Sequence, residues 1–213
     1  MLFADKNIKA IIFDMGGVLI DLDIPGCKEY FKTELGYMDI DTVLDPCHQK
    51  GIFGQLEEGL LSGDEFRAIV KEGSRPGVTD EQVNVAMYKI LKGIEPYKID
   101  LLHRLAKDYD LYILSNNNEI SIVCSSGMFK DAGFGLDTHF KKCYMSYELK
   151  VLKPAARFYQ AVMEDIGLPA EEMLFIDDSQ LNVDAAVAAG LPAIYYKPGT
   201  DLSQLLDDYI ASL

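Results

Sequence analysis

Residues 8–18 read IKAIIFDMGGV, in which Asp14 stands between an isoleucine-rich run and two glycines. The run formed by residues 8–13 is short and mostly apolar, and charged residues precede it. A run of this kind is typical of a strand that is buried on both faces of a parallel sheet. The sequence therefore predicts an inner strand that ends at an aspartate.

Three later runs resemble this one, and each follows a stretch with helical character. The runs are residues 111–114 (LYIL), 173–176 (MLFI) and 193–196 (AIYY), and the stretches before them are residues 97–109, 155–166 and 181–189. Strands that alternate with helices in this way imply right-handed crossovers. The predicted fold is α/β, with a Rossmann-like, mostly parallel sheet and helices on both faces.

The pattern changes between residues 23 and 95. This part contains no convincing strand, only amphipathic segments at residues 28–35, 63–72 and 80–91, separated by glycine and proline. It is interpreted as a small all-helical cap inserted after the first strand. The predicted division is a catalytic core of residues 1–22 and 96–213, and a cap of residues 23–95.

The charge balance limits the kinds of partner. The 213 residues include 34 acidic and 20 basic side chains, for a formal net charge of -14. Such a chain repels polyanions and anionic bilayers, so neither a nucleic acid nor a membrane is expected as a partner. An anionic small substrate would need local positive charge, from a metal ion or a well-placed lysine.

The cysteines and the chain start bear on the compartment. The four cysteines are scattered without a CxxC pair, which argues against a zinc site. No secretory signal opens the sequence, and no apolar run approaches the roughly 18 residues of a membrane span. A cytoplasmic protein with reduced thiols is predicted. The cysteines are Cys27, Cys47, Cys124 and Cys143.

Polar side chains follow the predicted strands at the point where each strand ends. Ligands of open parallel sheets bind at the carboxyl ends of the strands, so these side chains are expected to converge. Crowded carboxylates require a cation, and an all-oxygen ligand set beside a phosphate favours magnesium. A carboxylate can also attack phosphorus, while a lysine balances the charge. The residues are Asp14, Ser115, Asn116, Asp177 and Asp178, with Lys153 at the start of a helix.

Four short motifs, DMGGV, SNNN, KP and FIDDS, occur in this order at these positions. Together they resemble the four motifs of the haloacid dehalogenase superfamily, and the helical insert after the first motif is similar to the family's helical-cap branch. The resemblance implies a magnesium-dependent hydrolase. It implies these roles: Asp14 as nucleophile and metal ligand, Gly16 as a metal ligand through its carbonyl, Ser115 and Asn116 in phosphate binding, Lys153 in charge balance, and Asp177 and Asp178 as metal ligands.

One position departs from the family pattern. Family phosphatases usually carry an aspartate two places after the nucleophile, which protonates the leaving group, and here that place is Gly16. The family's dehalogenases generally have a tyrosine there. The start of the motif is most similar to a phosphatase-like subgroup with the pattern DxGxV. Asp21 and Asp23 are interpreted as turn residues, with replacement of the missing acid as the alternative.

The predicted function is a phosphatase of small phosphorylated metabolites that forms an aspartyl-phosphate intermediate. Residues 57–62 (EEGLLS) in the cap resemble a turn of sugar-phosphate phosphatases in this branch. The alternatives are a 2-haloacid dehalogenase, or a regulatory protein that binds phosphate and turns over weakly. A monomer or a homodimer is expected.

Overall fold

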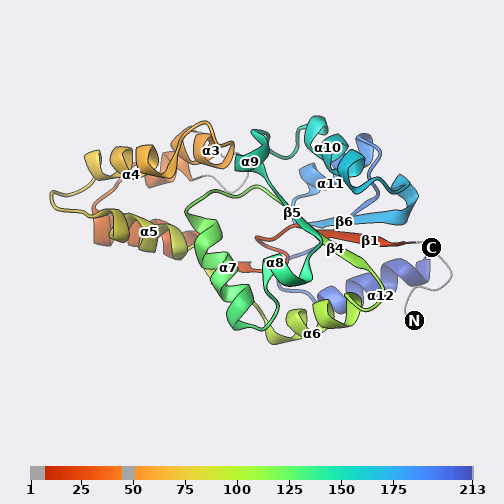
Figure 1. Cartoon of the computed structure of the whole chain (residues 1–213). Coiled ribbons are helices and arrows are strands. Elements are labelled where there is room, and N and C mark those ends of the chain that lie inside the picture. Colours follow the sequence, from red (N-terminus) through yellow and green to blue (C-terminus); the bar gives the residue numbers. More distant parts are fainter. Residues whose placement is uncertain (1–7, 45–50, 213) are drawn as a thin grey trace.

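The computed structural model describes residues 8–44 and 51–212. Its centre is a sheet of five parallel strands in the order β5-β4-β1-β6-β7, as Figure 1 shows. The prediction of a parallel sheet with helices on both faces is confirmed. The strands are β1 (Ala10–Phe13), β4 (Asp110–Ser115), β5 (Lys142–Met145), β6 (Met173–Asp177) and β7 (Ala193–Tyr195).

The strand β1 lies in the middle of the sheet, and its four residues are buried. Phe13 is in register with Ile113 of β4 on one side and with Ile176 of β6 on the other. The carboxyl ends of the three strands are therefore level, which brings the polar residues that follow them to one edge. The strand β7 differs from the prediction of a strand buried on both faces. It is an edge strand with one neighbour, and its Tyr195 is 40% exposed.

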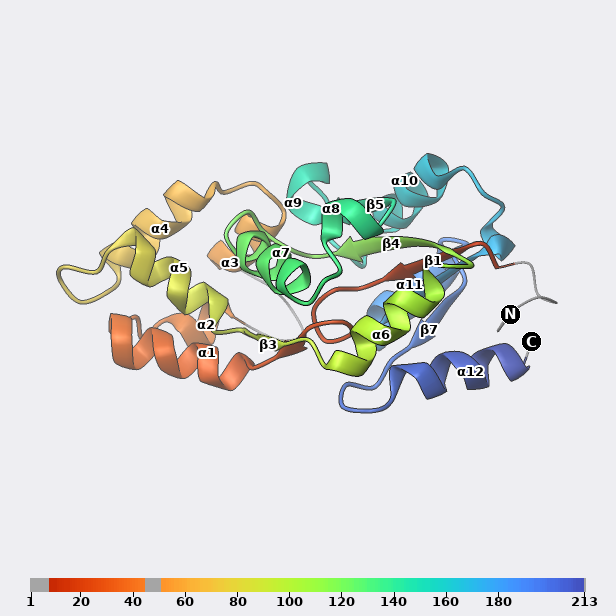
Figure 2. The same cartoon turned by 60° about the horizontal axis from the view of Figure 1, so that its bottom comes forward.

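Helices cover both faces of the sheet (Figures 1 and 2). On one face pack α6 (Pro96–Leu105), α7 (Ser121–Asp131) and α12 (Leu202–Ser212), which bury residues such as Leu102 and Phe129. On the other face pack α10 (Ala156–Ile166) and α11 (Gln180–Ala188). The short elements α8 (Leu136–His139), α9 (Ser146–Leu149) and η2 (Ala170–Glu172) complete the connections.

A second group of helices extends from one end of the sheet (Figure 1). These helices bury a hydrophobic cluster in which Phe53 makes edge contacts with Phe31 and Phe66, at ring-centroid distances of 6.0 and 5.1 Å. Capping boxes at Ser62 and Thr79 begin two of them. The helices are α1 (Ile24–Tyr30), the π-helix η1 (Phe31–Leu35), α2 (Ile40–Val43), α3 (Gly51–Glu57), α4 (Gly63–Glu72) and α5 (Asp80–Tyr88). We call this group the cap.

The prediction that residues 23–95 contain no strand is wrong at one point. A three-residue strand, β3 (Leu91–Gly93), pairs antiparallel with β2 (Asp21–Leu22). The predicted helix 80–91 is correspondingly too long, since α5 ends at Tyr88. Strands of two and three residues are too short to show an alternating pattern in the sequence. The exact cap boundaries at residues 23 and 95 stay a prediction.

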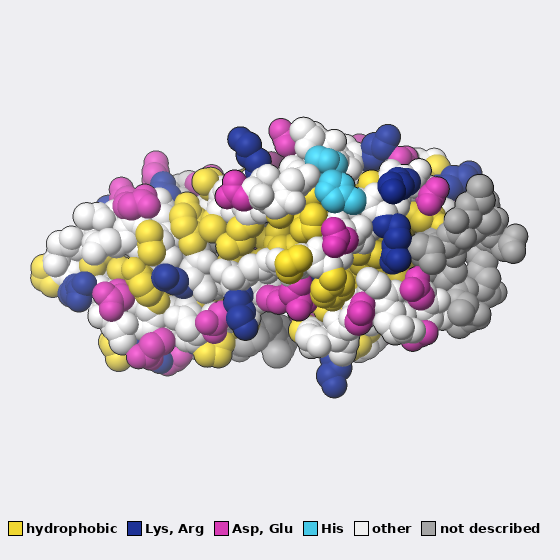
Figure 3. All heavy atoms as spheres, turned by 90° about the horizontal axis from the view of Figure 1, so that it is seen from below, with side chains coloured by type: hydrophobic (Ala, Val, Ile, Leu, Met, Phe, Trp, Pro, Cys, Tyr) yellow, Lys and Arg dark blue, Asp and Glu magenta, His cyan; other side chains and the backbone are white. Residues whose placement is uncertain are grey.

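Two surface properties of the described residues bear on the predicted partners. No helix among them is both long and apolar enough to cross a lipid bilayer. On the face seen in Figure 3, acidic and basic side chains are interspersed around a strip of hydrophobic ones.

Cys27, Cys124 and Cys143 are free thiols, whereas Cys47 lies outside the described residues.

Candidate active site

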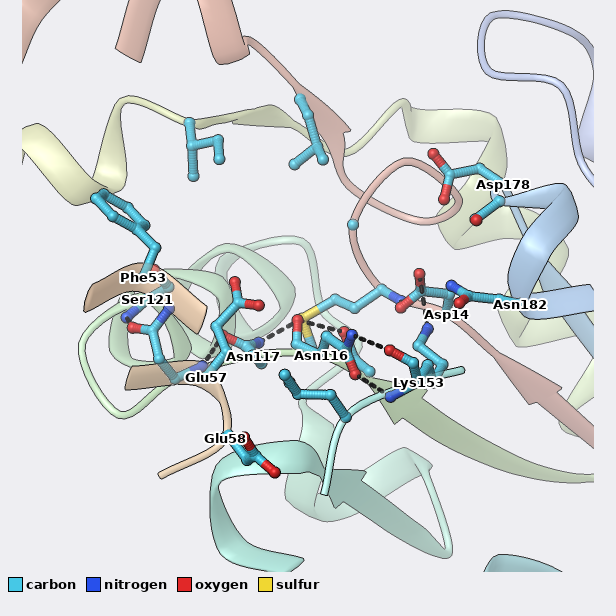
Figure 4. Close-up of a pocket in the computed structure, with 18 of the residues that line it drawn as sticks. Asp14, Phe53, Glu57, Glu58, Asn116, Asn117, Ser121, Lys153, Asp178 and Asn182 are labelled. Atoms are coloured by element: carbon cyan, nitrogen blue, oxygen red, sulfur yellow. Dashed lines mark hydrogen bonds and ion pairs between the residues drawn. The ribbon is translucent and has the colours of Figure 1, made fainter. Parts of the chain in front are cut away.

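Asp14 follows the last residue of β1 and is nearly buried, with 8% of its surface exposed. Its backbone amide donates to the carbonyl of Ile176 at 2.8 Å, which extends the sheet pairing by one residue. One carboxylate oxygen, Oδ1, accepts from the amide of Met15 at 2.6 Å. The other, Oδ2, lies 2.9 Å from Nζ of Lys153. The carboxylate is therefore held rigidly at the end of the central strand (Figure 4).

Lys153 links the carboxyl ends of the three inner strands β1, β4 and β6. Its Nζ donates to Oδ2 of Asp177 at 2.7 Å and to the carbonyl of Leu114 at 3.1 Å, in addition to its contact with Asp14. Burial favours the neutral amine, but the charges of Asp14 and Asp177 outweigh this effect and raise the pKa of Lys153. The ammonium is therefore charged, and it supplies the local positive charge that an anionic substrate requires.

The two aspartates at the end of β6 have different surroundings. Asp177 is fully buried, and its Oδ1 accepts from the Ser179 amide at 2.8 Å and from Nδ2 of Asn182 at 3.0 Å. Its other oxygen is held by Lys153. Asp178 is partly exposed and lines the cavity. Asp178 is thus the carboxylate of the pair that is more available to a ligand.

Asp14, Asp177 and Asp178 form an acidic cluster that fits a hard cation. Each offers a carboxylate oxygen, and these oxygens lie within 4.8 Å of one another. Burial raises the pKa of Asp14 to about 7, against the effect of Lys153 and with the help of the other two carboxylates. Burial and the charge of Asp177 raise the pKa of Asp178 to about 6. A bound cation would remove this repulsion, and oxygen donors suit magnesium.

Ser115 and Asn116 follow β4 and lie beside Lys153. The Asn116 side chain accepts from the backbone amide of Lys153 at 2.8 Å and donates to its carbonyl at 3.1 Å. This pair of bonds positions the lysine, so contact between Asn116 and phosphate depends on its backbone amide. Ser115 is buried and lines the cavity, and its hydroxyl donates to the carbonyl of Asn116 at 3.4 Å. The phosphate-binding roles of both residues stay predictions.

The strand ends and the cap line a cavity of about 660 Å³. Its core wall includes every predicted site residue except Asp177, which lies behind Lys153. Its cap wall is mainly apolar, with Glu57 and Glu58 as its acidic members (Figure 4). Sequence reasoning had not placed these two glutamates, Asn117 or Asn182 in the site. The signal was present for the glutamates, which begin the EEGLLS turn.

Asp21 and Asp23 do not line the cavity. Asp21 pairs with the buried Lys98, at 2.8 Å between Oδ1 and Nζ. Asp23 caps α1 by accepting from the Gly26 amide at 2.9 Å. The alternative that either residue replaces the missing acid is therefore wrong, because both side chains are engaged outside the cavity. The interpretation of Asp23 as a local structural residue agrees with its capping contact.

The family follows from a comparison with family models. The model of the haloacid dehalogenase-like hydrolases matches residues 8–190, which include all four motifs and the acidic cluster. The chain is a haloacid dehalogenase-like hydrolase. The predicted family is confirmed, while the DxGxV subgroup stays a prediction.

Individual relatives resemble this hydrolase over nearly its whole length. A D-ribitol-5-phosphate phosphatase of Bacteroides thetaiotaomicron is 36% identical over 201 residues, which are 93% of this chain and 97% of the relative. A wild-type family enzyme from the same organism, crystallised with magnesium and inorganic phosphate, superposes with a TM-score of 0.86 at 38% identity, over 93% of this chain and 98% of the other. A HAD-like hydrolase of Porphyromonas gingivalis has a TM-score of 0.87 at 34% identity, over 96% and 98%.

The glycine pair after the nucleophile allows a matched test of the site. Gly17 has a φ of 80°, and a Cβ there would lie 2.1 Å from Oδ2 of Asp178. Gly17→Ala is expected to lower the free energy of unfolding by about 1–3 kcal/mol and to displace Asp178. Activity should fall by about tenfold or more. Urea denaturation and initial rates at saturating magnesium measure the two effects.

Gly16→Ala is the control for this change. The backbone of Gly16 is not in the left-handed region, and a Cβ would lie 3.4 Å from the flexible side chain of Leu22. Gly16→Ala is therefore expected to lower the free energy of unfolding by less than about 1 kcal/mol. Equal losses of stability and activity in the two variants would contradict the role given to the close approach of Gly17 to Asp178.

Proposed function

We propose that this hydrolase is a magnesium-dependent phosphatase of small phosphorylated polyols or sugars, with Asp14 as its nucleophile. The observation that carries the proposal is the buried Asp14 carboxylate, held by Lys153 beside Asp178 in a cavity between the strand ends and the cap. Two relatives support the proposed reaction. One is a D-ribitol-5-phosphate phosphatase, and another was crystallised with magnesium and phosphate.

Each residue of the site has its own role in the proposed reaction. Asp14 attacks phosphorus and becomes an aspartyl phosphate, which water then hydrolyses. Lys153 stays charged next to the nucleophile and stabilises the negative charge on the transferring phosphoryl group. Asn116 holds the backbone of Lys153, and Ser115 binds a phosphoryl oxygen. Asp14, Asp178, Asp177 and the Gly16 carbonyl would hold magnesium, which when bound supplies charge neutralisation at the phosphoryl oxygens.

The cap of residues 23–95 provides the part of the cavity that contacts the leaving group. Side chains of α3, α5 and β3 line the cavity together with the strand ends, and its volume is suited to a small metabolite. A cavity of this volume favours a small phosphorylated molecule whose leaving group contacts the cap.

A substrate panel tests the proposal. With magnesium, D-ribitol 5-phosphate and related polyol and sugar phosphates are expected to have kcat/KM values about tenfold or more above those of nucleoside monophosphates. Released phosphate is measured for each compound. In parallel, halide release from 2-chloropropionate is measured with and without magnesium. Halide release in the absence of phosphate release would replace the phosphatase by a dehalogenase.

A further inference from the structure

The cavity contains carboxylates beyond those of the acidic cluster. Among the described residues that line it, the acidic side chains are Asp14, Asp178, Glu57 and Glu58. Asp14 and Asp178 belong to the cluster that suits a cation. Gly16 has no side chain that could donate a proton. The Asp21 carboxylate contacts Lys98, and the Asp23 carboxylate accepts from the Gly26 amide at the start of α1. Among the described residues, the carboxylates that remain as candidates for a general acid are Glu57 and Glu58 on the cap wall.

Glu57 is the last residue of α3, and core residues hold its backbone in place. The hydroxyl of Ser146 donates to the carbonyl of Glu57 at 2.6 Å. The same hydroxyl oxygen accepts from the amide of Asn117 at 3.0 Å, so it joins the cap to the loop after β4. Only 8% of the surface of Glu57 is exposed. Figure 4 shows its carboxyl group directed into the cavity.

The turn after Glu57 fixes this arrangement further. Gly59 has a φ of 66°, and a Cβ there would lie 2.2 Å from the carbonyl oxygen of Tyr147. The carbonyl of Gly59 accepts from Nζ of Lys150. Both observations join the turn after α3 to α9 and its C-cap residue in the core. Although Glu57 belongs to the cap, its backbone is therefore held against the core.

Glu58 is adjacent in sequence but differs in its surroundings. Its side chain is 31% exposed, and Oε1 lies 3.8 Å from Nη2 of Arg157 on α10. Glu58 therefore offers a matched comparison with Glu57 on the same helix end.

We propose that Glu57 is the general acid and base of the phosphatase reaction, in the place that Gly16 leaves open. The proposal rests on the proposed function. In the first step Oδ of Asp14 bonds to phosphorus, and the bond from phosphorus to the leaving oxygen breaks. That oxygen keeps the electron pair and takes the proton of the Glu57 carboxyl. The products are an alcohol, the aspartyl phosphate and a Glu57 carboxylate.

In the second step water attacks the phosphorus of the aspartyl phosphate. The Glu57 carboxylate takes a proton from this water, and the bond between phosphorus and Asp14 breaks with its electron pair returning to the Asp14 carboxylate. Inorganic phosphate leaves, and Glu57 is protonated again. The cycle therefore consumes one water and returns both carboxyl groups to their starting states.

The electrostatic surroundings of Glu57 agree with this assignment. Burial raises its pKa to about 8, and the charge of Asp14 acts in the same direction against that of Lys153. The other charged groups of the cavity are Asp178 at the strand ends, and Glu58 with Arg157 at its outer side. Glu57 thus retains its proton at neutral pH, as a general acid must.

Rates with different leaving groups provide the first test. In Glu57→Gln, kcat for alkyl phosphates is expected to fall by about 10²–10⁴-fold, whereas the rate of p-nitrophenol release in the first turnover changes by less than about tenfold. The phenolate is a weak base and needs little protonation. Glu58→Gln should keep the leaving-group dependence of the native enzyme. In the native enzyme kcat/KM for alkyl phosphates should fall as the pH rises through about 8, and Glu57→Gln should lack this decline.

The intermediate provides the second test. With p-nitrophenyl phosphate, Glu57→Gln is expected to release about one equivalent of p-nitrophenol in a burst and to accumulate phosphate on Asp14, since no base activates water. Acid quenching and mass spectrometry detect this species. The burst itself shows that the variant is folded.

Two results would overturn the proposal. One is a Glu57→Gln enzyme with the native leaving-group dependence and no accumulated phosphoenzyme. The other is a higher KM with unchanged kcat, which would make Glu57 a substrate-binding residue. Failure of the proposed function looks different, because the native enzyme would then form no phosphoenzyme with any substrate.

Discussion

Replacing Asp14 by asparagine is expected to lower turnover by about 10⁴-fold or more, to the background rate. The amide has nearly the shape of the carboxylate but lacks the charge that attacks phosphorus. Phosphate release from the best substrate of the panel measures the loss. In the native protein, acid quenching during turnover should reveal phosphate on Asp14, and the variant should show none.

The fold of the Asp14→Asn variant is expected to survive. Burial raises the pKa of Asp14 from 3.8 to about 7, so the ionised carboxylate is less stable in the folded protein than in the unfolded chain. Asparagine removes this cost above pH 7, while Lys153 retains Asp177 as a partner at 2.7 Å. The melting temperature at pH 8 without metal should be equal to or above that of the native protein. A variant with more than about 1% of native turnover would rule out Asp14 as the nucleophile.

Removal of magnesium is expected to abolish phosphatase activity, and excess magnesium should restore it. Calcium should bind but support turnover poorly, since it tolerates looser and higher coordination. Initial rates after chelation and after addition of each cation measure this dependence. Full activity in the presence of chelator would contradict a metal-dependent phosphatase.

The acidic cluster also predicts how magnesium binding depends on pH. The pKa values of Asp14 and Asp178 are raised to about 7 and about 6, mainly by burial. The unfolded chain loses these protons near pH 4, so the metal-free protein loses stability as the pH rises from about 4 to about 7. Magnesium needs the ionised carboxylates and compensates for this loss.

The increase in melting temperature caused by magnesium should therefore be larger at pH 8 than at pH 5.5. Below pH 6, the binding constant should fall by about tenfold per pH unit for each proton displaced. Thermal melting and calorimetric titration at the two pH values measure these effects. Asp178→Asn is the control, and its magnesium response should be small at both. An equal response of the native protein at both pH values would contradict the role of these carboxylates.

The core of the fold could be predicted from local patterns. The last four residues of the run IKAIIF form the fully buried β1, and the runs beginning near Leu111 and Met173 form its two neighbours. Buried parallel strands are apolar throughout, so their signal lies within a few consecutive residues. The polar residues that follow such strands meet at one edge for geometric reasons. Asp14 and Lys153 were therefore expected together, and Nζ of Lys153 lies 2.9 Å from the Asp14 carboxylate.

The strand pairing of β3 and the environment of single side chains could not be predicted in the same way. β3 contains three residues and depends on pairing with β2, which is distant in sequence. Asp21 and Asp23 follow the nucleophile closely in the chain, yet their side chains contact Lys98 and the start of α1. Proximity in sequence did not bring either of them to the cavity.

Motif order and strand-end chemistry thus determine the family, the sheet and the residues around Asp14 from the sequence alone. The wall opposite Asp14 depends on tertiary structure, because it forms only when the cap packs on the core. Glu57 enters the cavity through the hydrogen bond from Ser146 to its carbonyl, between residues 89 positions apart. No local pattern encodes such a contact, since it forms between two segments that are distant in sequence.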